Sequence, residues 1–293
     1  VIPSKFDADS LKIAAIAVAK KADIVLFIGG LNKNHHQDCE GGDRLSYELP
    51  FGQNELINEI SSVNKNIGVV LISGNAVAMP WLPKVQGLVQ SWYLGSESGH
   101  ALADILSGDV NPSGKLPFTY PVKLTDNGAH YFGELSYPGD SIDQYYKEDI
   151  FVGYRWHEHK KIRPQFAFGE GLSYTKFTIE NVRASENSAT ENTDFQIICD
   201  IHNIGNREGS EVVQIYVGKP KSVVERAVKE LKGFKKVFLQ KGEEKTVSIT
   251  LNPKSFAFYD ESISDWNLER GEYIIYVGTA SNNIHQKIKI KIN

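Results

Sequence analysis

Apolar residues recur with two different spacings along this chain of 293 residues. Between residues 9 and 108, short apolar runs alternate with segments of helical spacing, which is typical of a doubly wound, mostly parallel α/β sandwich. The runs typical of buried strands are residues 23–30, 67–74 and 85–93. The helical segments are residues 11–22, with Ser10 as the expected N-cap, 50–64 and 96–108. We therefore predict an α/β sandwich domain over residues 1–110.

From residue 175 the spacing changes to a period of two. Seven short segments alternate apolar and polar residues and are separated by turn-forming residues, which predicts a seven-stranded antiparallel β-sandwich over residues 175–293. These segments are residues 177–184, 195–204, 211–218, 230–239, 245–251, 271–278 and 285–292. The last of them alternates basic and apolar residues, as an edge or half-exposed strand does.

Residues 111–174 follow neither spacing. They are rich in Tyr, Phe, Gly and Pro, and a structureless connection of this length is uncommon within a compact domain. Because the aromatic content is too high for a disordered linker, we predict an ordered, aromatic-rich strap between the two domains.

Composition excludes several classes of protein. The formal charge is −4, with 32 basic and 36 acidic residues, so no basic excess is available to bind nucleic acid. No apolar run reaches the roughly 20 residues that span a bilayer. The two cysteines, Cys39 and Cys199, are too few for a disulfide framework or a four-thiolate zinc site, and they leave the cellular compartment open.

Candidate chemistry gathers where the predicted parallel strands end. Ligands of open parallel sheets bind outside the carboxyl ends of the strands, and three segments meet at that edge. The polar and aromatic residues that they bring there are Asp38, Glu40, Asp43, Arg44, Trp81, Trp92, Tyr93 and Glu97.

Two kinds of site are disfavoured at this edge. Gly29 and Gly30 follow a strand, but the G-x-G-x-x-G pattern of dinucleotide binding is missing and no cofactor is predicted. Metal binding is also disfavoured, because the spacing of the possible ligands matches no zinc pattern. These possible ligands are His35, His36, Asp38, Cys39 and Glu40, and separately the pair His157 and His159.

The segment from Glu40 to Arg44 favours acid catalysis. Glu40 precedes two glycines, so its carboxylic acid stands on a loop that could swing over a sugar and protonate a leaving-group oxygen. The alternative is that Asp43 and Arg44 fix the base of the loop while Glu40 is merely solvated. Aromatic residues at the same edge could stack on the apolar face of a sugar or could equally belong to the core: Trp81, Trp92 and Tyr93.

Ordered motifs along nearly the whole chain resemble the carboxyl-terminal half of glycoside hydrolase family 3, the β-glucosidase family. The motifs of the first half are EGGDRLSYELPFGQNELI, SGNAVAMPW, QSWYLGSESGHALADILSGDVNPSGKLPFTYP, EDIFVGYRW and PQFAFGEGLSYTKF. The later motifs resemble the fibronectin-III-like domain of the same family and are EVVQIYVGKP, ELKGFKKVFLQKGEEKTVSITL, FAFYD and GEYIIYVG.

The resemblance implies a retaining exo-β-glycosidase, most often a β-glucosidase, that hydrolyses terminal non-reducing β-D-glucosyl residues. It places the general acid/base on Glu40 and makes Asp43 and Arg44 the support of its loop. It also puts an aglycone-side wall here, for which we select Trp81, Trp92, Tyr93 and His36. The nucleophilic Asp would lie in a (β/α)8-type barrel that this chain does not contain.

The same resemblance implies that the chain is part of a larger assembly. The first strand of the α/β sandwich, which normally carries a G-P-N-A-like turn, has no counterpart before Val1. We therefore expect a barrel from the rest of the chain or from a second chain, a small oligosaccharide or an aryl or alkyl β-glycoside as substrate, and a periplasmic or secreted location. A homo-oligomer is left open, and the alternative function is that of a non-catalytic carbohydrate-binding or scaffold fragment.

Overall fold

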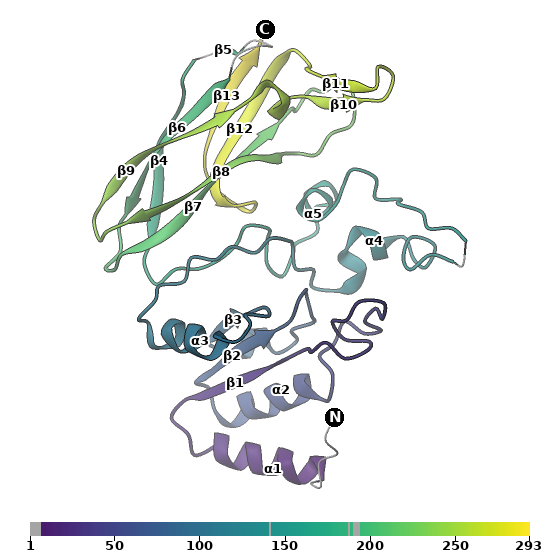
Figure 1. Cartoon of the computed structure of the whole chain (residues 1–293), viewed down its shortest axis with the longest axis vertical. Coiled ribbons are helices and arrows are strands. Elements are labelled where there is room, and N and C mark those ends of the chain that lie inside the picture. The colour runs from purple at the N-terminus through teal and green to yellow at the C-terminus, as the bar shows by residue number, and fades with distance from the viewer. Residues whose placement is uncertain (1–6, 141, 187, 190–193) are drawn as a thin grey trace. The chain divides into compact units, whose positions relative to one another are not determined.

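The chain divides into two compact units, Val1–Ala103 and Asp104–Asn293, and the boundary lies within helix α3. The computed structural model describes residues 7–140, 142–186, 188–189 and 194–293 (Figure 1).

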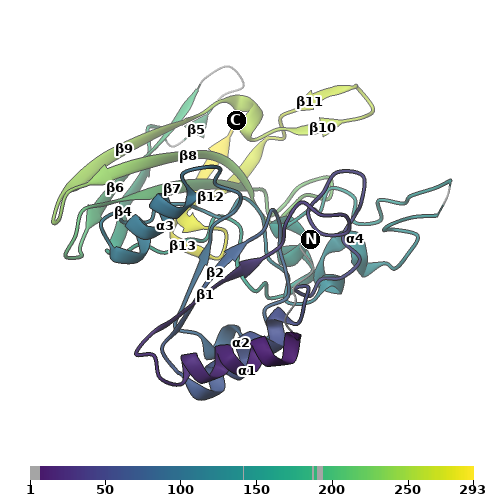
Figure 2. The same ribbon diagram turned by 60° about the horizontal axis from the view of Figure 1, so that its bottom comes forward.

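The first unit is built on a parallel sheet with the strand order β1-β2-β3. Its strands are β1 (Val25–Gly30), β2 (Ile67–Ile72) and β3 (Gly87–Gln90). The helices are α1 (Ala8–Ala19), α2 (Gln53–Val63), α3 (Ser98–Ser107) and the 3-10 turn η1 (Leu82–Lys84). Helices α1 and α2 pack together on one side of the sheet (Figures 1 and 2). This arrangement confirms the predicted α/β architecture.

The N-cap of α1 differs from the prediction. Asp7 has extended backbone geometry, and its carboxylate accepts a hydrogen bond from the backbone N–H of Ser10 at 3.3 Å. The helix therefore begins three residues before the expected position, and Ser10 lies within its first turn. A carboxylate is an effective cap because it accepts from an unpaired N–H and also complements the positive end of the helix dipole.

The two glycines that end β1 are required by close packing. Gly30 has a φ of 138°, and a Cβ atom there would lie 1.9 Å from the carbonyl oxygen of Ile72. The side-chain amide of Gln53, at the start of α2, accepts from the N–H of Gly30 at 2.7 Å and donates to its carbonyl at 2.9 Å. The end of β1 is therefore fixed to both β2 and α2, and the loop that follows leaves from a rigid point.

Strand β1 is less buried than its apolar sequence predicted. Leu26 is 44% exposed and Ile28 is 56% exposed, whereas Val69, Val70 and Leu71 of β2 are buried. Phe27 and Gly29 lie on the side of β1 that faces Gln53 of α2, so Leu26 and Ile28 lie on the opposite face of the sheet. Parallel strands normally have both faces covered. The expectation of three buried strands is therefore met only by β2, because β3 has no buried residue either.

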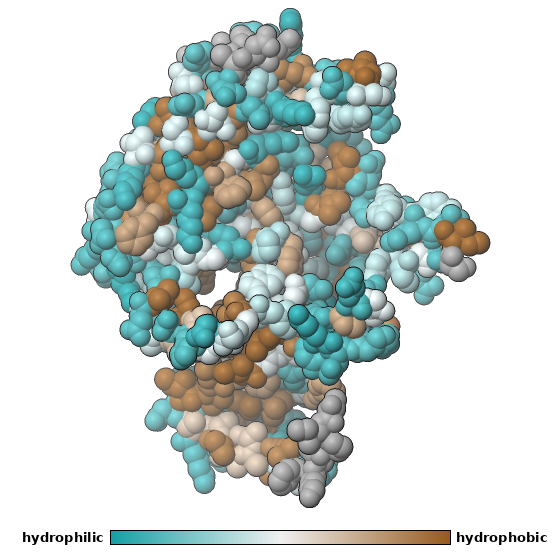
Figure 3. Space-filling model, in the orientation of Figure 1, coloured by the Kyte–Doolittle hydropathy of each residue, from teal (hydrophilic) through white to brown (hydrophobic). Residues whose placement is uncertain are grey.

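Apolar exposure continues around this unit. Leu11, Ile13 and Val18 of α1 are exposed, as is Ile24 just before β1, and α3 has no buried side chain. Figure 3 shows apolar side chains gathered over the α/β unit. We call six exposed side chains, from α1, from β1 and from the residue just before β1, the apolar face: Leu11, Ile13, Val18, Ile24, Leu26 and Ile28.

The second unit begins with the strap. It contains short helical segments and a β-bridge between Tyr120 and Phe166, rather than regular strands: η2 (Leu124–Asp126), α4 (Gly128–Tyr131) and α5 (Tyr154–Lys160). Trp156 of α5 is fully buried, and its indole N–H donates to the carbonyl of Asp126 at 3.0 Å. Aromatic packing around Trp156 thus orders part of this segment.

The rest of the second unit is a β-sandwich, which confirms the fold predicted from the period of two. One sheet has the order β5-β13-β12-β7-β8 and the other the order β4-β6-β9. The strands of the first sheet are β5 (Ser188–Ala189), β13 (Asn283–Ile292), β12 (Gly271–Ala280), β7 (Gly209–Gly218) and β8 (Glu230–Leu239). The second sheet consists of β4 (Phe177–Ala184), β6 (Phe195–Asn203) and β9 (Glu244–Leu251). A hairpin follows the 3-10 turn η3 (Pro253–Ser255) and is formed by β10 (Phe258–Asp260) and β11 (Asp265–Asn267).

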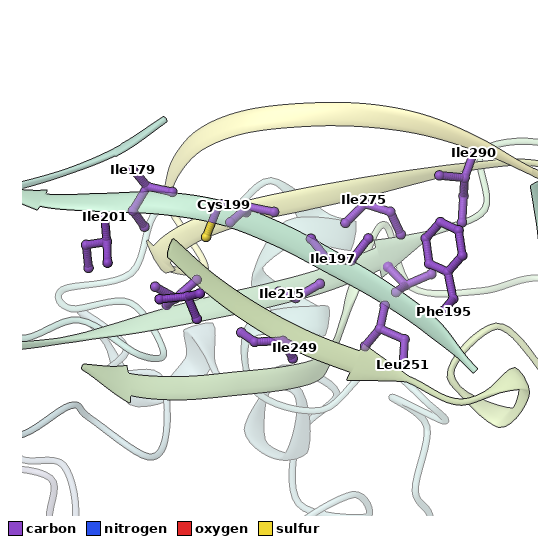
Figure 4. Close-up of a cluster of buried hydrophobic side chains, with 14 of the residues drawn as sticks. Ile179, Phe195, Ile197, Cys199, Ile201, Ile215, Ile249, Leu251, Ile275 and Ile290 are labelled. Atoms are coloured by element: carbon purple, nitrogen blue, oxygen red, sulfur yellow. The ribbon is translucent and has the colours of Figure 1, made fainter. Parts of the chain in front are cut away.

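The core of the sandwich lies between its two sheets. Alternate residues of β6 point inward, so Ile197, Cys199 and Ile201 are buried and pack with Ile215 and Ile275 of the opposite sheet (Figure 4). Burial raises the pKa of the Cys199 thiol to about 11, so it stays protonated and behaves as a small apolar side chain. Cys199 and Cys39 are both free.

Candidate functional site

Glu40 lies at the tip of a tight turn in the loop that follows β1. The turn is closed by a β-bridge between Cys39 and Gly42, and the thiol of Cys39 donates a hydrogen bond to the carbonyl oxygen of Gly42 at 3.4 Å. Gly41 has a φ of 73°, in the region that favours glycine, and a Cβ on Gly42 would lie 2.7 Å from the ring of His35. The two glycines thus let the chain reverse within four residues and leave Glu40 exposed at the apex.

The carboxyl side of the turn is anchored to the loop after β2. The guanidinium Nη2 of Arg44 donates to the carbonyl of Ala76 at 2.6 Å. The Nδ1 atom of His36 lies 3.1 Å from the carbonyl oxygen of Asp43, so the tautomer with a proton on Nδ1 donates within the loop. Arg44 therefore links two loops at the carboxyl edge of the sheet, and the ring of His36 lies against the loop's own backbone.

The amino side of the turn is anchored by Asp38. Its Oδ2 atom accepts from the backbone N–H of Gly74 at 2.7 Å and from the hydroxyl of Tyr93 at 2.9 Å. Gly74 follows β2 and Tyr93 follows β3, so one carboxylate oxygen joins the loops after all three parallel strands. Burial, together with the neighbouring Asp38 carboxylate, raises the pKa of Tyr93, which keeps its hydroxyl protonated as a donor.

The contacts distinguish Glu40 from two other acids of this loop. One oxygen of Asp38 already accepts two hydrogen bonds, and Glu48 accepts a hydrogen bond from the amide of Asn54. An acid that protonates a substrate must be accessible to it. Glu40 meets that requirement because it is exposed, whereas Asp38 is half-buried and Glu48, although exposed, is bonded to Asn54.

Trp81 does not lie on the substrate side of the loop. It is 0% exposed, and its indole N–H donates to the side-chain oxygen of Asn54 at 2.7 Å. The same Asn54 amide donates to Glu48, so Trp81 belongs to a satisfied polar network in the core. The selection of Trp81 as a sugar-stacking residue is therefore corrected, because a buried ring cannot contact a ligand.

Trp92 and Tyr93 remain at the edge of the sheet. Trp92 is half-buried and has a φ of 58°, which is rare for a bulky residue and costs conformational energy. Tyr93 is 39% exposed, and the ammonium of Lys33 lies 5.9 Å from the centre of its ring. Part of the Tyr93 ring can therefore contact a ligand while its hydroxyl holds Asp38.

A small cavity of about 160 Å³ lies beside the loop. Its lining includes His36, Arg44 and Glu48, but it does not include Glu40. Of the expected site residues, His36 and Arg44 line this cavity, whereas Glu40 lies outside it at the apex of the turn.

The described residues contain no group of three or more His, Cys, Asp or Glu side chains that could hold a metal ion. In the same described part of the chain, no helix is long and apolar enough to cross a membrane.

This chain belongs to glycosyl hydrolase family 3. The sequence model of the Glycosyl hydrolase family 3 C-terminal domain matches residues 2–154, and that of the Fibronectin type III-like domain matches residues 211–281. Both matches agree with the resemblance found in the sequence motifs.

Two curated relatives are β-glucosidases. Beta-glucosidase BoGH3A of Bacteroides ovatus is 52% identical over 97% of this chain and 38% of that protein. Thermostable beta-glucosidase B of Acetivibrio thermocellus is 42% identical over 99% of this chain and also 38% of that protein. The chain therefore spans well under half the length of the relatives it matches.

Solved structures give the same result for the fold. The β-glucosidase of Kluyveromyces marxianus in complex with glucose superposes with a TM-score of 0.90 at 40% identity, over 99% of this chain and 34% of that one. The family 3 β-glucosidase of Bifidobacterium adolescentis gives a TM-score of 0.90 at 35% identity, over 99% and 42% of the two chains.

Sequence reasoning missed the contacts of Asp38. It placed Asp38 at the right edge of the sheet but assigned it no partner, and it selected Tyr93 only for sugar stacking. A signal was present, since an acid and a phenol followed the first and third strands, and the carboxyl ends of parallel strands converge. Only the tertiary structure distinguishes this pair from the other polar residues at that edge.

Proposed function

We propose that this chain supplies the general acid/base, Glu40, and the aglycone-side wall of a retaining exo-β-glucosidase. The reaction is hydrolysis of terminal non-reducing β-D-glucosyl residues from small oligosaccharides or from aryl and alkyl β-glycosides. The observation that carries the proposal is the exposed Glu40 at the apex of a turn that is anchored on both sides. The names of its relatives and their identity over nearly the whole chain support the choice of reaction.

Two carboxylic groups about 5–5.5 Å apart are needed for a retaining mechanism. In the first step, Glu40 donates its proton to the glycosidic oxygen as the bond to the sugar breaks and a second carboxylate attacks the anomeric carbon. In the second step, the Glu40 carboxylate takes a proton from the water that releases the sugar. We assign the second carboxylate to an Asp of a barrel domain, from the same protein or a second chain.

The other site residues have supporting roles in this proposal. Arg44 holds the loop after β1 to the loop after β2, and Asp43 lies between Arg44 and the turn, with its carbonyl 3.1 Å from His36. His36, Trp92 and the exposed part of the Tyr93 ring form the aglycone side. Glycosides that differ only in the aglycone are therefore expected to respond to substitutions at these three positions.

Replacing Glu40 by Gln in the complete enzyme tests the acid/base assignment. We expect turnover of glucosides with poor leaving groups to fall by about 10²–10⁴-fold, because general acid catalysis is lost. Activated aryl glucosides should lose less, since their leaving groups depart without a proton, and azide should restore part of the rate by attacking the glycosyl-enzyme.

Glu48→Gln is the matched control, because Glu48 is also an exposed acid of this loop but has no role in the proposed reaction. It should retain the dependence on leaving group of the unmodified enzyme. Equal losses of the Glu40→Gln enzyme on all aglycones, with no effect of azide, would contradict the assignment.

A further inference from the structure

Asp38 is placed to control the position of the turn that carries Glu40. Only Cys39 separates the two acids, so their Cα atoms are at most about 7 Å apart at the reach of a trans chain. Resting on the function proposed above, we propose that Asp38 is a positioning residue for Glu40, and that Tyr93 is the donor that holds Asp38 in place.

The geometry favours a carboxylate at this position. Both donors, the N–H of Gly74 and the hydroxyl of Tyr93, reach the same oxygen of Asp38, at 2.7 and 2.9 Å. Hydrogen bonds to an ionised acceptor are roughly twice as strong as neutral ones, so the charge of Asp38 strengthens both contacts together. A neutral acceptor would leave the turn less firmly held.

The absence of a side chain at residue 74 is part of the same arrangement. A Cβ atom there would lie 3.3 Å from Oδ2 of Asp38 and 3.4 Å from Cε2 of Tyr93. Glycine therefore lets the carboxylate of Asp38 and the ring of Tyr93 both lie close to residue 74 without displacement. Gly74 lies 36 positions after Asp38 in the sequence, and Tyr93 lies 55 positions after it. These two hydrogen bonds therefore fix the turn to the loops that follow β2 and β3.

The two anchors of the turn act on opposite sides. Arg44 holds the carboxyl side to Ala76, and Asp38 holds the amino side to Gly74, two residues before Ala76 in the same loop. With one anchor lost, the turn could pivot about the other and move Glu40 relative to the glycosidic oxygen. A displacement of about 1 Å in a reacting group can lower a rate on the order of 100-fold.

The test compares Asp38→Ala, Asp38→Asn, Tyr93→Phe and the double variant Asp38→Ala/Tyr93→Phe in the complete enzyme, with Glu40→Gln assayed beside them. The substrates are aryl β-glucosides with leaving groups of graded acidity. Tyr174→Phe is the matched control, because it removes a phenol that donates to a backbone carbonyl elsewhere, at 2.8 Å from Ile105. Thermal melting of each variant shows whether it folds, and Tyr93→Phe keeps the ring if Asp38→Ala does not fold.

We expect Asp38→Ala and Tyr93→Phe to lower kcat for poor leaving groups by about 10- to 100-fold, with a smaller loss for activated ones and little change in KM. Azide should not restore the rate, because the Glu40 carboxylate is still present near the sugar. Asp38→Asn should retain more activity than Asp38→Ala, since an amide oxygen can accept the same hydrogen bonds. The double variant should lose little more than Asp38→Ala alone, because both changes remove the same anchor.

The outcomes separate this inference from the proposed function. In one outcome, the loss of turnover in Glu40→Gln depends on the leaving group, but the folded Tyr93→Phe and Asp38 variants retain as much activity as Tyr174→Phe. The positioning role is then wrong and the acid/base assignment stands. If Glu40→Gln itself shows no such dependence, the proposed function fails first. Azide rescue of Asp38→Ala as strong as that of Glu40→Gln would instead make Asp38 the acid, and would also overturn the inference.

Discussion

The β-sandwich and the parallel sheet of the α/β unit differ in how completely their strands are buried. In the β-sandwich, inward-facing residues of both sheets form a closed core in which Ile215 and Ile275 are 0% exposed. In the α/β unit, the apolar face of α1 and β1 stays exposed, with Ile24 at 75% and Ile28 at 56%. Both units are rich in β-branched and aliphatic residues, so composition does not explain the difference.

The difference shows which of the two folds buries its apolar side chains by itself. A sandwich of two sheets buries the apolar side of every strand within itself, whereas a parallel sheet needs layers on both of its faces. The apolar face therefore has the character of a surface that another layer covers. The anchored turn of Glu40 belongs to this same incompletely covered unit.

The largest expected effect compares two isoleucines in strands. Ile215→Ala should lower the free energy of unfolding of the sandwich by about 2–5 kcal/mol, because it opens a cavity in a closed core. Ile28→Ala should cost at most about 0.5 kcal/mol in the α/β unit, because half of its side chain is already in water. Urea denaturation of the chain measures both, and equal losses would mean that β1 is covered after all.

An intermediate effect is expected on self-association. Within the apolar face, Ile24, Leu26 and Ile28 alternate along the chain and so share one face of the strand, and exposed apolar side chains gathered in this way promote association. The chain alone should therefore associate at increasing concentration, and a double change Ile24→Lys and Ile28→Lys should reduce this in light scattering. Val223→Lys is the matched control, because Val223 is 82% exposed but lies in the sandwich unit. A monomeric unmodified chain, or equal effects of both changes, would count against the covering layer.

The smallest expected effect is a pH dependence confined to the second unit. Burial lowers the pKa of His157 in α5, and its Nδ1 atom lies 3.1 Å from the carbonyl oxygen of Ile162. Because the folded-state pKa is below the unfolded value of about 6.5, the unfolded chain binds more protons as the pH falls through that value. Stability of this unit should therefore decrease from pH 7.5 to 5.5, and His157→Asn should weaken the decrease. Denaturation midpoints at the two pH values measure it, and an unchanged slope in the variant would assign the effect to other groups.

Much of the fold could be predicted from the sequence because its signals are local. The period of two placed β4 and β8 at the residues where the structure has them, and the helical spacing of 11–22 overlaps α1. The N-cap was misplaced, since Asp7 and Ser10 are both good capping residues and only the hydrogen bond between them shows which one caps.

The candidate site was predictable only in part. Residue type and the position after a strand brought Asp38, Glu40, Trp81 and Tyr93 to one edge, because parallel strands end together. Their different roles depend on packing: Trp81 is enclosed by the core and bonded to Asn54, whereas Tyr93 is part exposed and bonded to Asp38. Residue type does not reveal which of two aromatic residues is buried, because burial depends on segments far away along the chain.

The sequence by itself determined the two architectures, their order along the chain and the glycine-containing turn that presents Glu40. These depend on periodicity and on the backbone freedom of particular residues, both of which can be read over a few positions. Only the tertiary structure decided that Asp38 is held by hydrogen bonds while Glu40 is exposed. It also decided that one face of β1 stays uncovered. Those properties arise from contacts such as that between Asp38 and Gly74, 36 residues apart, where one hydrogen bond at 2.7 Å distinguishes an anchoring carboxylate from an exposed one.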